Sequence, residues 1–180
     1  RVAMLERIAA ADADFQAAAR QAITARERRD LLLSETLRPM GRAFREDLSQ
    51  IADGALAAGD TSSAADAGAA QETLMLARLY AERFASYGIE AHRERAEAEL
   101  AELADKLRAL LIGLQSPERR ALANGIIQGM PEFLNAMAAM KSWSERLAQA
   151  ETDIATANAT VRENVVAIVD STVTDLARLQ

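Results

Sequence analysis

The sequence predicts an all-α protein built from long antiparallel helices. Alanine, leucine, glutamate and arginine, which favour helices strongly, are abundant, whereas aromatic residues make up only 4% of the chain. Apolar residues recur at alternating steps of three and four over long stretches, as they do on the buried face of a helix. Glycine and proline gather at a few positions, which mark the ends of helices. We expect two four-helix bundles stacked end to end, with a single up-down four-helix bundle as the alternative.

The first helix is expected to run from near the start of the chain to about Leu37. Its apolar seam comprises Leu5, Ile8, Phe15, Ala19, Ala22 and Leu33. Pro39 lacks a backbone donor and biases the residue before it away from helical geometry, and Gly41 follows, so the helix should kink or stop there. A second helix should extend from about Arg42 to Ala58.

Turn signals place the next two helices. The stretch Gly59–Ser63 is a polar loop that ends in good N-cap residues, so a third helix should follow it to about Ser86. The seam of this helix comprises Leu74, Ala77, Ala81 and Phe84. Tyr87-Gly88 supplies a C-cap, and a fourth helix with a charged outer face is expected from about Glu90 to Ile112.

The second half of the chain has one clear boundary. Gly113 and Ser116-Pro117-Glu118 predict a helix start, because serine caps helices and proline suits the first helical position. Two glycines and a proline within residues 125–131 then interrupt the pattern, either as a kink or as a second helix start. From Met140 onward the spacing is almost unbroken, so the last helix should be long. Its seam comprises Met140, Trp143, Leu147, Ala150, Ile154, Ala157, Val161, Val165, Ile168, Thr172, Leu176 and Leu179.

The expected helices comprise two long ones of about 38 residues, first and last in the chain, and four shorter ones of about 18 to 26 residues. At about 1.5 Å per residue a long helix spans roughly 55–60 Å, so two short helices must share the length of one long helix. Two stacked four-helix bundles, each using half of both long helices, are the economical packing. The two chain ends then lie together, as a domain between two transmembrane helices requires.

Composition excludes several classes of function. The net charge of −6 argues against a nucleic-acid-binding surface, which needs clustered positive charge. The absence of cysteine excludes disulfides and thiolate sites. No apolar run approaches the about 20 residues that span a bilayer. The chain begins at Arg1 without an initiator methionine and stops at Gln180 within an apolar helical pattern, so we expect a segment of a longer protein.

No motif for catalysis is present, and we expect no enzyme, no cofactor and no metal site. His92 is the only histidine, and its place in a polar helix start predicts a solvated surface residue. The sequence contains no pattern typical of a nucleophile with its base, a glycine-rich phosphate loop, zinc ligands or the Glu-x-x-His pair of di-iron bundles.

Arginines at core positions are the most informative polar feature. The spacing of three and four that defines the apolar seam of the first helix, continued from Ala22 to Leu33, falls on Arg26 and Arg29. An unpaired buried charge is costly. The two guanidinium groups are therefore paired with carboxylates such as Glu27 or Asp30, displaced to the rim by helix drift, or placed to bind an anionic ligand.

Two further arginines flank apolar seams. Arg78 lies beside the seam of the third helix, and Arg146 lies beside that of the last helix, next to Trp143 and Leu147. Flanking arginines commonly lay their stems over apolar surface, which is the structural alternative to a ligand role. A ligand site requires that arginines from several helices converge, and the sequence alone does not show this.

The segments Leu74–Phe84 and Ala25–Leu32 carry a resemblance to a known family. Both look like recurrent segments of the helical bimodular sensor domains of bacterial chemoreceptors and sensor kinases, and the order of two long and four short helices is similar too. The resemblance implies a periplasmic domain between two transmembrane helices of an inner-membrane protein, dimeric in the receptor, that binds a small carboxylate such as an organic acid. By motif match Arg26, Arg29 and Arg78 would be ligand arginines, with Arg146 a looser match by position.

We therefore expect residues 1–180 to form one ligand-binding sensor domain of a methyl-accepting chemotaxis receptor, with a histidine kinase output left open. A small anion would bridge arginines on different helices and shift the first helix relative to the last by an ångström or two. The alternative is a helical dimerisation or scaffolding module with no small-molecule ligand. The chain is shorter than a typical family member before Arg78, which leaves open a reduced membrane-distal module or a missing pocket.

Overall fold

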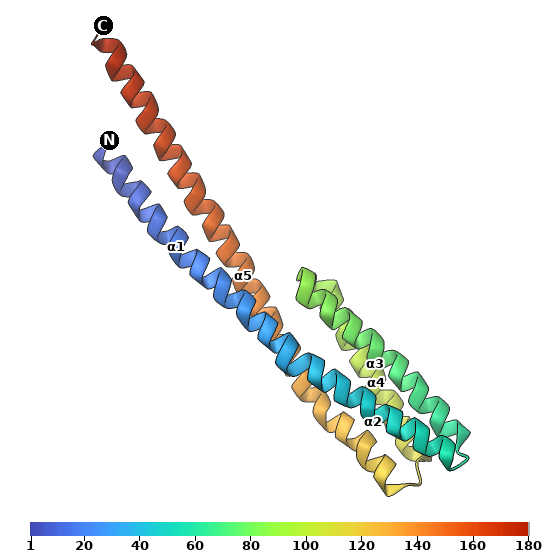
Figure 1. Ribbon diagram of the computed structural model, residues 1–180. Coiled ribbons are helices and arrows are strands. Elements are labelled where there is room, and N and C mark those ends of the chain that lie inside the picture. Colours follow the sequence, from blue (N-terminus) through green and yellow to red (C-terminus); the bar gives the residue numbers. More distant parts are fainter. Residues whose placement is uncertain (180) are drawn as a thin grey trace. The chain divides into compact units, whose positions relative to one another are not determined.

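The computed structural model describes residues 1–179, and every secondary-structure element in that range is a helix (Figure 1). The elements are α1 (Val2–Leu31), the π-helical turn η1 (Leu32–Leu37), α2 (Arg38–Ala57), α3 (Thr61–Tyr87), α4 (Glu90–Gly113) and α5 (Pro117–Arg178). The predicted all-α class is confirmed. Among the described residues, no helix carries an apolar stretch sufficient to cross a bilayer.

The chain divides into two compact units. One comprises Arg1–Arg28 together with the chain from Ser142 onward, and we call it the two-helix unit. The other comprises Arg29–Lys141, and we call it the four-helix unit. The long helix α5 contributes to both units, as does the helical run that begins with α1.

Of the two outcomes expected at Pro39, a kink or a stop, the stop is wrong, because α1, η1 and α2 follow one another without interruption. The wider turn of η1 explains how the helix continues. Its hydrogen bonding reaches back five residues, as when the Arg38 N–H donates to the Leu33 carbonyl. A π turn of this kind makes room for a proline ring that would collide with the carbonyl four residues earlier in a regular α-helix. The helix expected to begin near Arg42 is therefore a continuation of the first.

The interruption expected within residues 125–131 is not a second helix start, because α5 runs from Pro117 to Arg178 with Pro131 inside it. Gly129 has a packing role instead. A Cβ at this position would lie 2.8 Å from Cζ of Phe44, so the missing side chain lets the Phe44 ring approach α5 closely. The four shorter helices expected from the sequence are consequently two, α3 and α4.

The remaining helix boundaries lie where the turn signals place them. Asp60 caps α3 by accepting a hydrogen bond from the Ser63 N–H at 3.0 Å. Gly88 follows the end of α3 in the left-handed conformation, with φ of 66°, which glycine adopts without strain. Ser116 caps α5 by accepting a hydrogen bond from the Arg119 N–H at 3.3 Å. Predictions of the third and fourth helices are correct to within about two residues.

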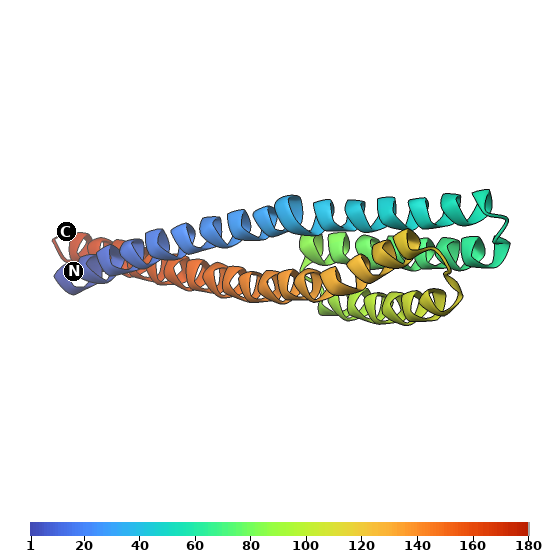
Figure 2. The same ribbon diagram turned by 90° about the horizontal axis from the view of Figure 1, so that it is seen from below.

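The four-helix unit has a large apolar core. Its helices alternate in direction, and α2, α3, α4 and the first part of α5 gather around one interior (Figure 2). Each helix contributes fully buried side chains. Examples are Leu48 and Ile51 from α2, Leu74 and Phe84 from α3, Leu103 and Leu107 from α4, and Ile126 and Phe133 from α5. The rings of Phe44 and Phe133 stack with centroids 6.5 Å apart.

The two-helix unit is a pair of antiparallel helices, α1 and the later part of α5. Its contact is formed mainly by alanines, and the apolar residues buried there are Ala11, Ala18, Ala22, Ala25, Leu147, Ala150 and Ala157. Arg1 donates to the Ser171 carbonyl at 3.0 Å and forms an ion pair with Asp175, so the chain ends lie side by side as predicted. The predicted seam of α1 is wrong at Leu5, which is 58% exposed.

Candidate functional site

The four predicted ligand arginines are divided equally between the units. Arg26 and Arg146 belong to the two-helix unit, whereas Arg29 and Arg78 belong to the four-helix unit. In each unit one of the two arginines, Arg26 or Arg29, is bound by an oxygen atom of the protein.

Arg26 and Arg29 are both engaged by the protein itself. Arg26 forms an ion pair with Glu151 at 3.0 Å, and both side chains are largely exposed. Arg29 donates to the carbonyl of Ala85, in the last turn of α3, where helix carbonyls lack an N–H donor from their own helix. Its Nε atom is buried without a hydrogen bond. These contacts favour the structural interpretation of both residues, pairing for Arg26 and helix capping for Arg29.

Arg78 lies across the backbone of the neighbouring helix α2. A Cβ built at Gly41 would lie 2.8 Å from both Cδ and Nε of Arg78, closer than such atoms pack. Glycine at position 41 is therefore what allows the Arg78 side chain to take this path. The stem of the arginine is held against α2, in agreement with an arginine that covers apolar surface.

The charge of Arg78 has no close partner, because its nearest acid along α3 is occupied. Glu82 lies one turn further on, but Arg38 binds it with two hydrogen bonds, Nε to Oε1 at 2.7 Å and Nη2 to Oε2 at 2.9 Å. These bonds hold the pKa of Glu82 below its usual value, while Arg78 adds only a small through-space contribution. Within residues 1–179, Arg78 forms no ion pair and no hydrogen bond.

A groove between α2 and α3 is also lined by Arg78. It has a volume of about 570 Å³ and is lined by Arg45, Ser49, Gly68, Gln71, Glu72, Leu74, Met75 and Arg78. Its second cation, Arg45, is on α2 and is exposed. The groove thus presents two arginines from different helices. We call it the α2–α3 groove.

Arg45 is a site residue that sequence reasoning missed. Positions three and four residues to either side of it hold Gly41, Arg42, Leu48 and Ser49, none of which is acidic. A helical arginine without an acid at these positions has no partner on its own helix. That signal is readable from sequence, but only the structure shows that Arg45 and Arg78 line one groove.

A second groove lies between α1 and α5 in the two-helix unit. It has a volume of about 600 Å³ and is lined by Ala17, Arg20, Gln21, Thr24, Trp143 and Arg146. The Arg146 guanidinium lies 4.5 Å from the centroid of the Trp143 ring, which is cation–π geometry. Arg146 is therefore engaged with an aromatic face, as an arginine that covers apolar surface would be.

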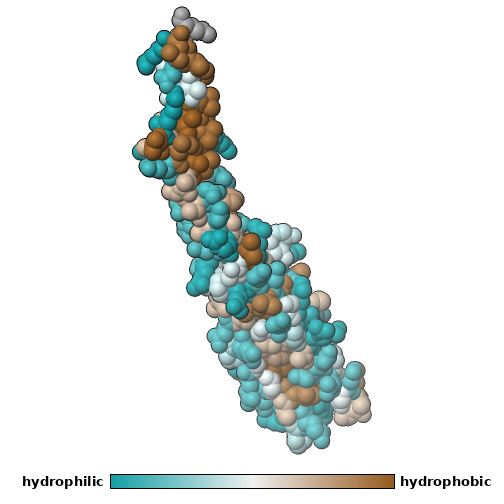
Figure 3. All heavy atoms as spheres, turned by 60° about the vertical axis from the view of Figure 1, so that its left-hand side comes forward, coloured by the Kyte–Doolittle hydropathy of each residue, from teal (hydrophilic) through white to brown (hydrophobic). Residues whose placement is uncertain are grey.

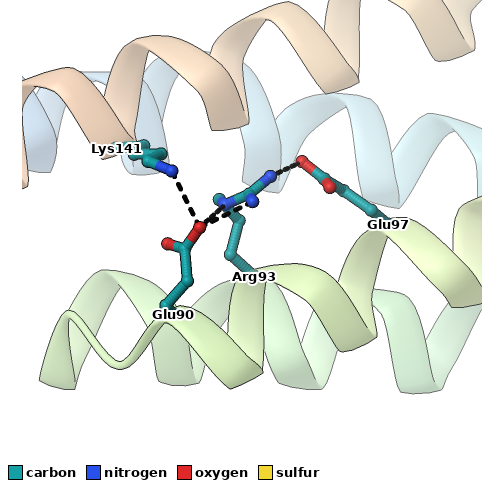
Figure 4. A network of polar contacts seen from close by, with 4 residues as sticks. All are labelled: Glu90, Arg93, Glu97 and Lys141. Atoms are coloured by element: carbon teal, nitrogen blue, oxygen red, sulfur yellow. Dashed lines mark hydrogen bonds and ion pairs between the residues drawn. The ribbon is translucent and has the colours of Figure 1, made fainter.

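A third group of charged residues forms an ion-pair network in which both cations, Arg93 and Lys141, have acidic partners. Glu90 of α4 accepts hydrogen bonds from Arg93 Nε at 3.0 Å and from Lys141 Nζ of α5 at 2.8 Å, and Arg93 also pairs with Glu97 (Figure 4). These donors, chiefly Arg93, lower the pKa of Glu90 to about 2. The network joins the start of α4 to α5 and has a structural role.

His92, predicted to be a solvated surface residue, is half-buried and packs beside two tyrosines. Its ring lies 6.0 Å from that of Tyr80 and 6.5 Å from that of Tyr87, measured between centroids. No group of three or more histidine or acidic side chains suited to a metal ion occurs in the part of the chain that the structure describes.

Comparisons with models of protein families, with curated proteins and with solved structures give no match. The resemblance to helical bimodular sensor domains therefore stays a prediction.

Proposed function

We propose that this chain is the periplasmic ligand-binding domain of an inner-membrane methyl-accepting chemotaxis receptor and that it binds a small carboxylate in the α2–α3 groove. The observation that supports this proposal is that Arg45 and Arg78, from two helices, line one groove and form no ion pair within residues 1–179. Planar guanidinium groups bind carboxylates with paired hydrogen bonds, which makes an organic acid a fitting ligand.

The electrostatic setting favours an anion at this groove. The chain has an overall charge of −6, whereas this groove is lined by two arginines and one carboxylate, Glu72, and so has a net positive charge. The volume of about 570 Å³ lies in the range typical of small-molecule sites. Leu74 and Met75 add apolar lining next to the arginines.

A homodimer formed through the two-helix unit is part of the proposal. Val165, Val169, Val173 and Leu176 follow one another on α5 at steps of four, four and three, and all are between 45% and 60% exposed. This apolar stripe lies toward the end of the unit (Figure 3). A second copy that covers it would surround the seam with four helices and so form a second four-helix bundle.

Signalling would use the helices that both units share. The run from Val2 to Ala57 and the helix α5 each pass through both units without interruption. A ligand that holds α2 against α3 would favour one packing of these helices over another, because it acts only through unequal affinity for the two states.

The test is a thermal-shift screen of the domain against organic acids, amino acids and inorganic anions. A ligand at 100 times its dissociation constant stabilises a protein by about 2.7 kcal/mol. We expect one carboxylate to raise the melting temperature of the wild type and not that of Arg78→Ala. Arg26→Ala is the matched control, because Arg26 is already paired with Glu151.

The second candidate function is a dimerisation or scaffolding module without a small ligand. The exposed apolar stripe on α5 favours it, since such a stripe serves a scaffold as well as a receptor. A dimer in solution together with no thermal response to any compound would select this function over the sensor.

A further inference from the structure

We propose that the ligand of the α2–α3 groove is an α-amino acid, bound through both its carboxylate and its ammonium group. This inference rests on the proposed function, because it concerns the same carboxylate site, and it specifies the class of carboxylate. It depends on Glu72, a carboxylate of the groove with which an organic acid that lacks an amino group would form no ion pair.

The groove contains one unpaired carboxylate opposite in sign to its arginines. Glu72 lines it, and the residues three and four positions away are Gly68, Ala69, Met75 and Leu76, none of them basic. In the described chain Glu72 takes part in no ion pair or hydrogen bond. A dicarboxylate in this groove would meet the repulsion of Glu72, whereas a zwitterion would place an ammonium group beside it.

A second acceptor is available next to Glu72. The side-chain amide of Gln71 is oriented by its Nε2 atom, which donates to Ser49 Oγ of α2 at 2.9 Å. Its Oε1 atom is then left to accept a hydrogen bond. Glu72 and Gln71 together offer the acceptors that an ammonium group needs, on the helix that also carries Arg78.

The groove also has room and apolar surface for a side chain. Leu74 is buried and Met75 is 63% exposed, so a ligand side chain that packs here would cover a flexible methionine. A Cβ added at Gly68 would meet nothing within 4 Å, so that part of the groove is open. These features favour an amino acid with an apolar side chain.

The experiment compares amino acids with carboxylic acids that lack the amino group. The twenty standard L-amino acids are screened by thermal shift, and each one that responds is titrated calorimetrically beside its des-amino acid. L-Leucine and 4-methylpentanoate form the first pair. We expect the amino acid to bind at least about tenfold more tightly, as the loss of a charge-assisted hydrogen bond implies.

Variants separate this inference from the proposed function. Glu72→Gln should weaken amino-acid binding about tenfold and leave the des-amino acid within about twofold. Arg78→Gln should abolish the binding of both. Glu94→Gln, at an exposed position on α4, is the matched control and should change neither. Circular dichroism melts confirm that each variant is folded.

The possible results have distinct meanings. Equal binding of an amino acid and its des-amino acid, with no effect of Glu72→Gln, overturns the amino-acid inference and leaves the carboxylate site standing. Binding of des-amino acids alone has the same meaning. If no amino acid and no carboxylic acid raises the melting temperature or binds in the calorimeter, both proposals are overturned.

Discussion

The two units contain stretches of the same long helices, yet they bury different kinds of side chain. In the four-helix unit, large residues such as Phe44, Ile51 and Phe133 are enclosed by four helices. In the two-helix unit, the contact between α1 and α5 is formed mainly by alanines such as Ala18 and Ala150, while valines further along α5 are exposed. Alanine lets two helices approach closely but removes little apolar surface from water.

The difference shows what a regular apolar pattern does and does not reveal. Along α5 the pattern continues from Met140 to Leu176 at nearly constant spacing, but its early members are buried and Leu176 is 59% exposed. The spacing identifies a face of the helix that is suited to packing. It does not say whether the partner belongs to the same chain or to a second copy.

The largest expected effect concerns the core of the four-helix unit. Phe133→Ala should reduce the free energy of unfolding by about 3–5 kcal/mol, because it leaves a cavity beside Phe44. Leu176→Ala, at an exposed position in the two-helix unit, should change it by less than about 0.5 kcal/mol at concentrations where the protein is monomeric. Urea denaturation measures both. Similar losses for the two variants would contradict the contrast between the units.

The next effect concerns association through the two-helix unit. Replacing Val169 and Val173 by glutamate places charges on the apolar stripe and should convert a dimer into a monomer. Sedimentation velocity measures the change. The same double substitution at Leu56 and Met75, exposed residues of the four-helix unit, is the control and should leave the dimer intact. A monomeric wild type at high concentration would rule out this interface.

A smaller effect distinguishes two glycines of α5 in the four-helix unit. Gly129→Ala should destabilise by about 1–3 kcal/mol, because the new methyl group meets the Phe44 ring. Gly125→Ala meets nothing within 4 Å and should stabilise the helix by roughly 0.5–1 kcal/mol. Thermal unfolding of the two variants tests the difference. Equal effects would mean that Phe44 does not pack against α5 at this point.

The smallest effect is the response of the Glu90 network to acid. The pKa of Glu90 is lowered from 4.5 to about 2 in the folded protein, so its contribution to stability is present above pH 4.5 and is lost as the pH falls toward 2. Glu90→Gln removes this titration. Its melting temperature should therefore fall less than that of the wild type between pH 5 and pH 2. Parallel pH profiles would contradict the ion-pair network.

Local rules predicted the fold well where a boundary depends on nearby residues. The caps at Gly88 and Ser116 are short-range features, and the sequence places both, whereas α3 begins at Thr61, within the predicted loop, with Asp60 as its cap. The helix does not stop at Pro39, because the π turn before the proline has backbone hydrogen bonds that leave room for its ring. No pattern of side chains in the sequence predicts a π turn at this position.

The candidate site was less accessible to prediction than the fold. Arg78 stood out because it flanks an apolar seam, but its freedom from partners depends on Arg38, forty residues away, which occupies Glu82. Arg45 and Glu72 could not be identified as site residues from the sequence, because they line one groove only when α2 packs beside α3. Their significance lies in contacts between helices, which a single sequence does not contain.

The most direct test of the carboxylate site is a nuclear magnetic resonance titration that follows the arginine Nε–H signals as the most stabilising carboxylate is added. Arginine-to-lysine variants assign the signals. We predict that those of Arg45 and Arg78 shift together and saturate, while the signal of Arg26, which is paired with Glu151, stays in place. Saturable shifts confined to other arginines, with Arg45 and Arg78 unchanged, would contradict a ligand site in the α2–α3 groove.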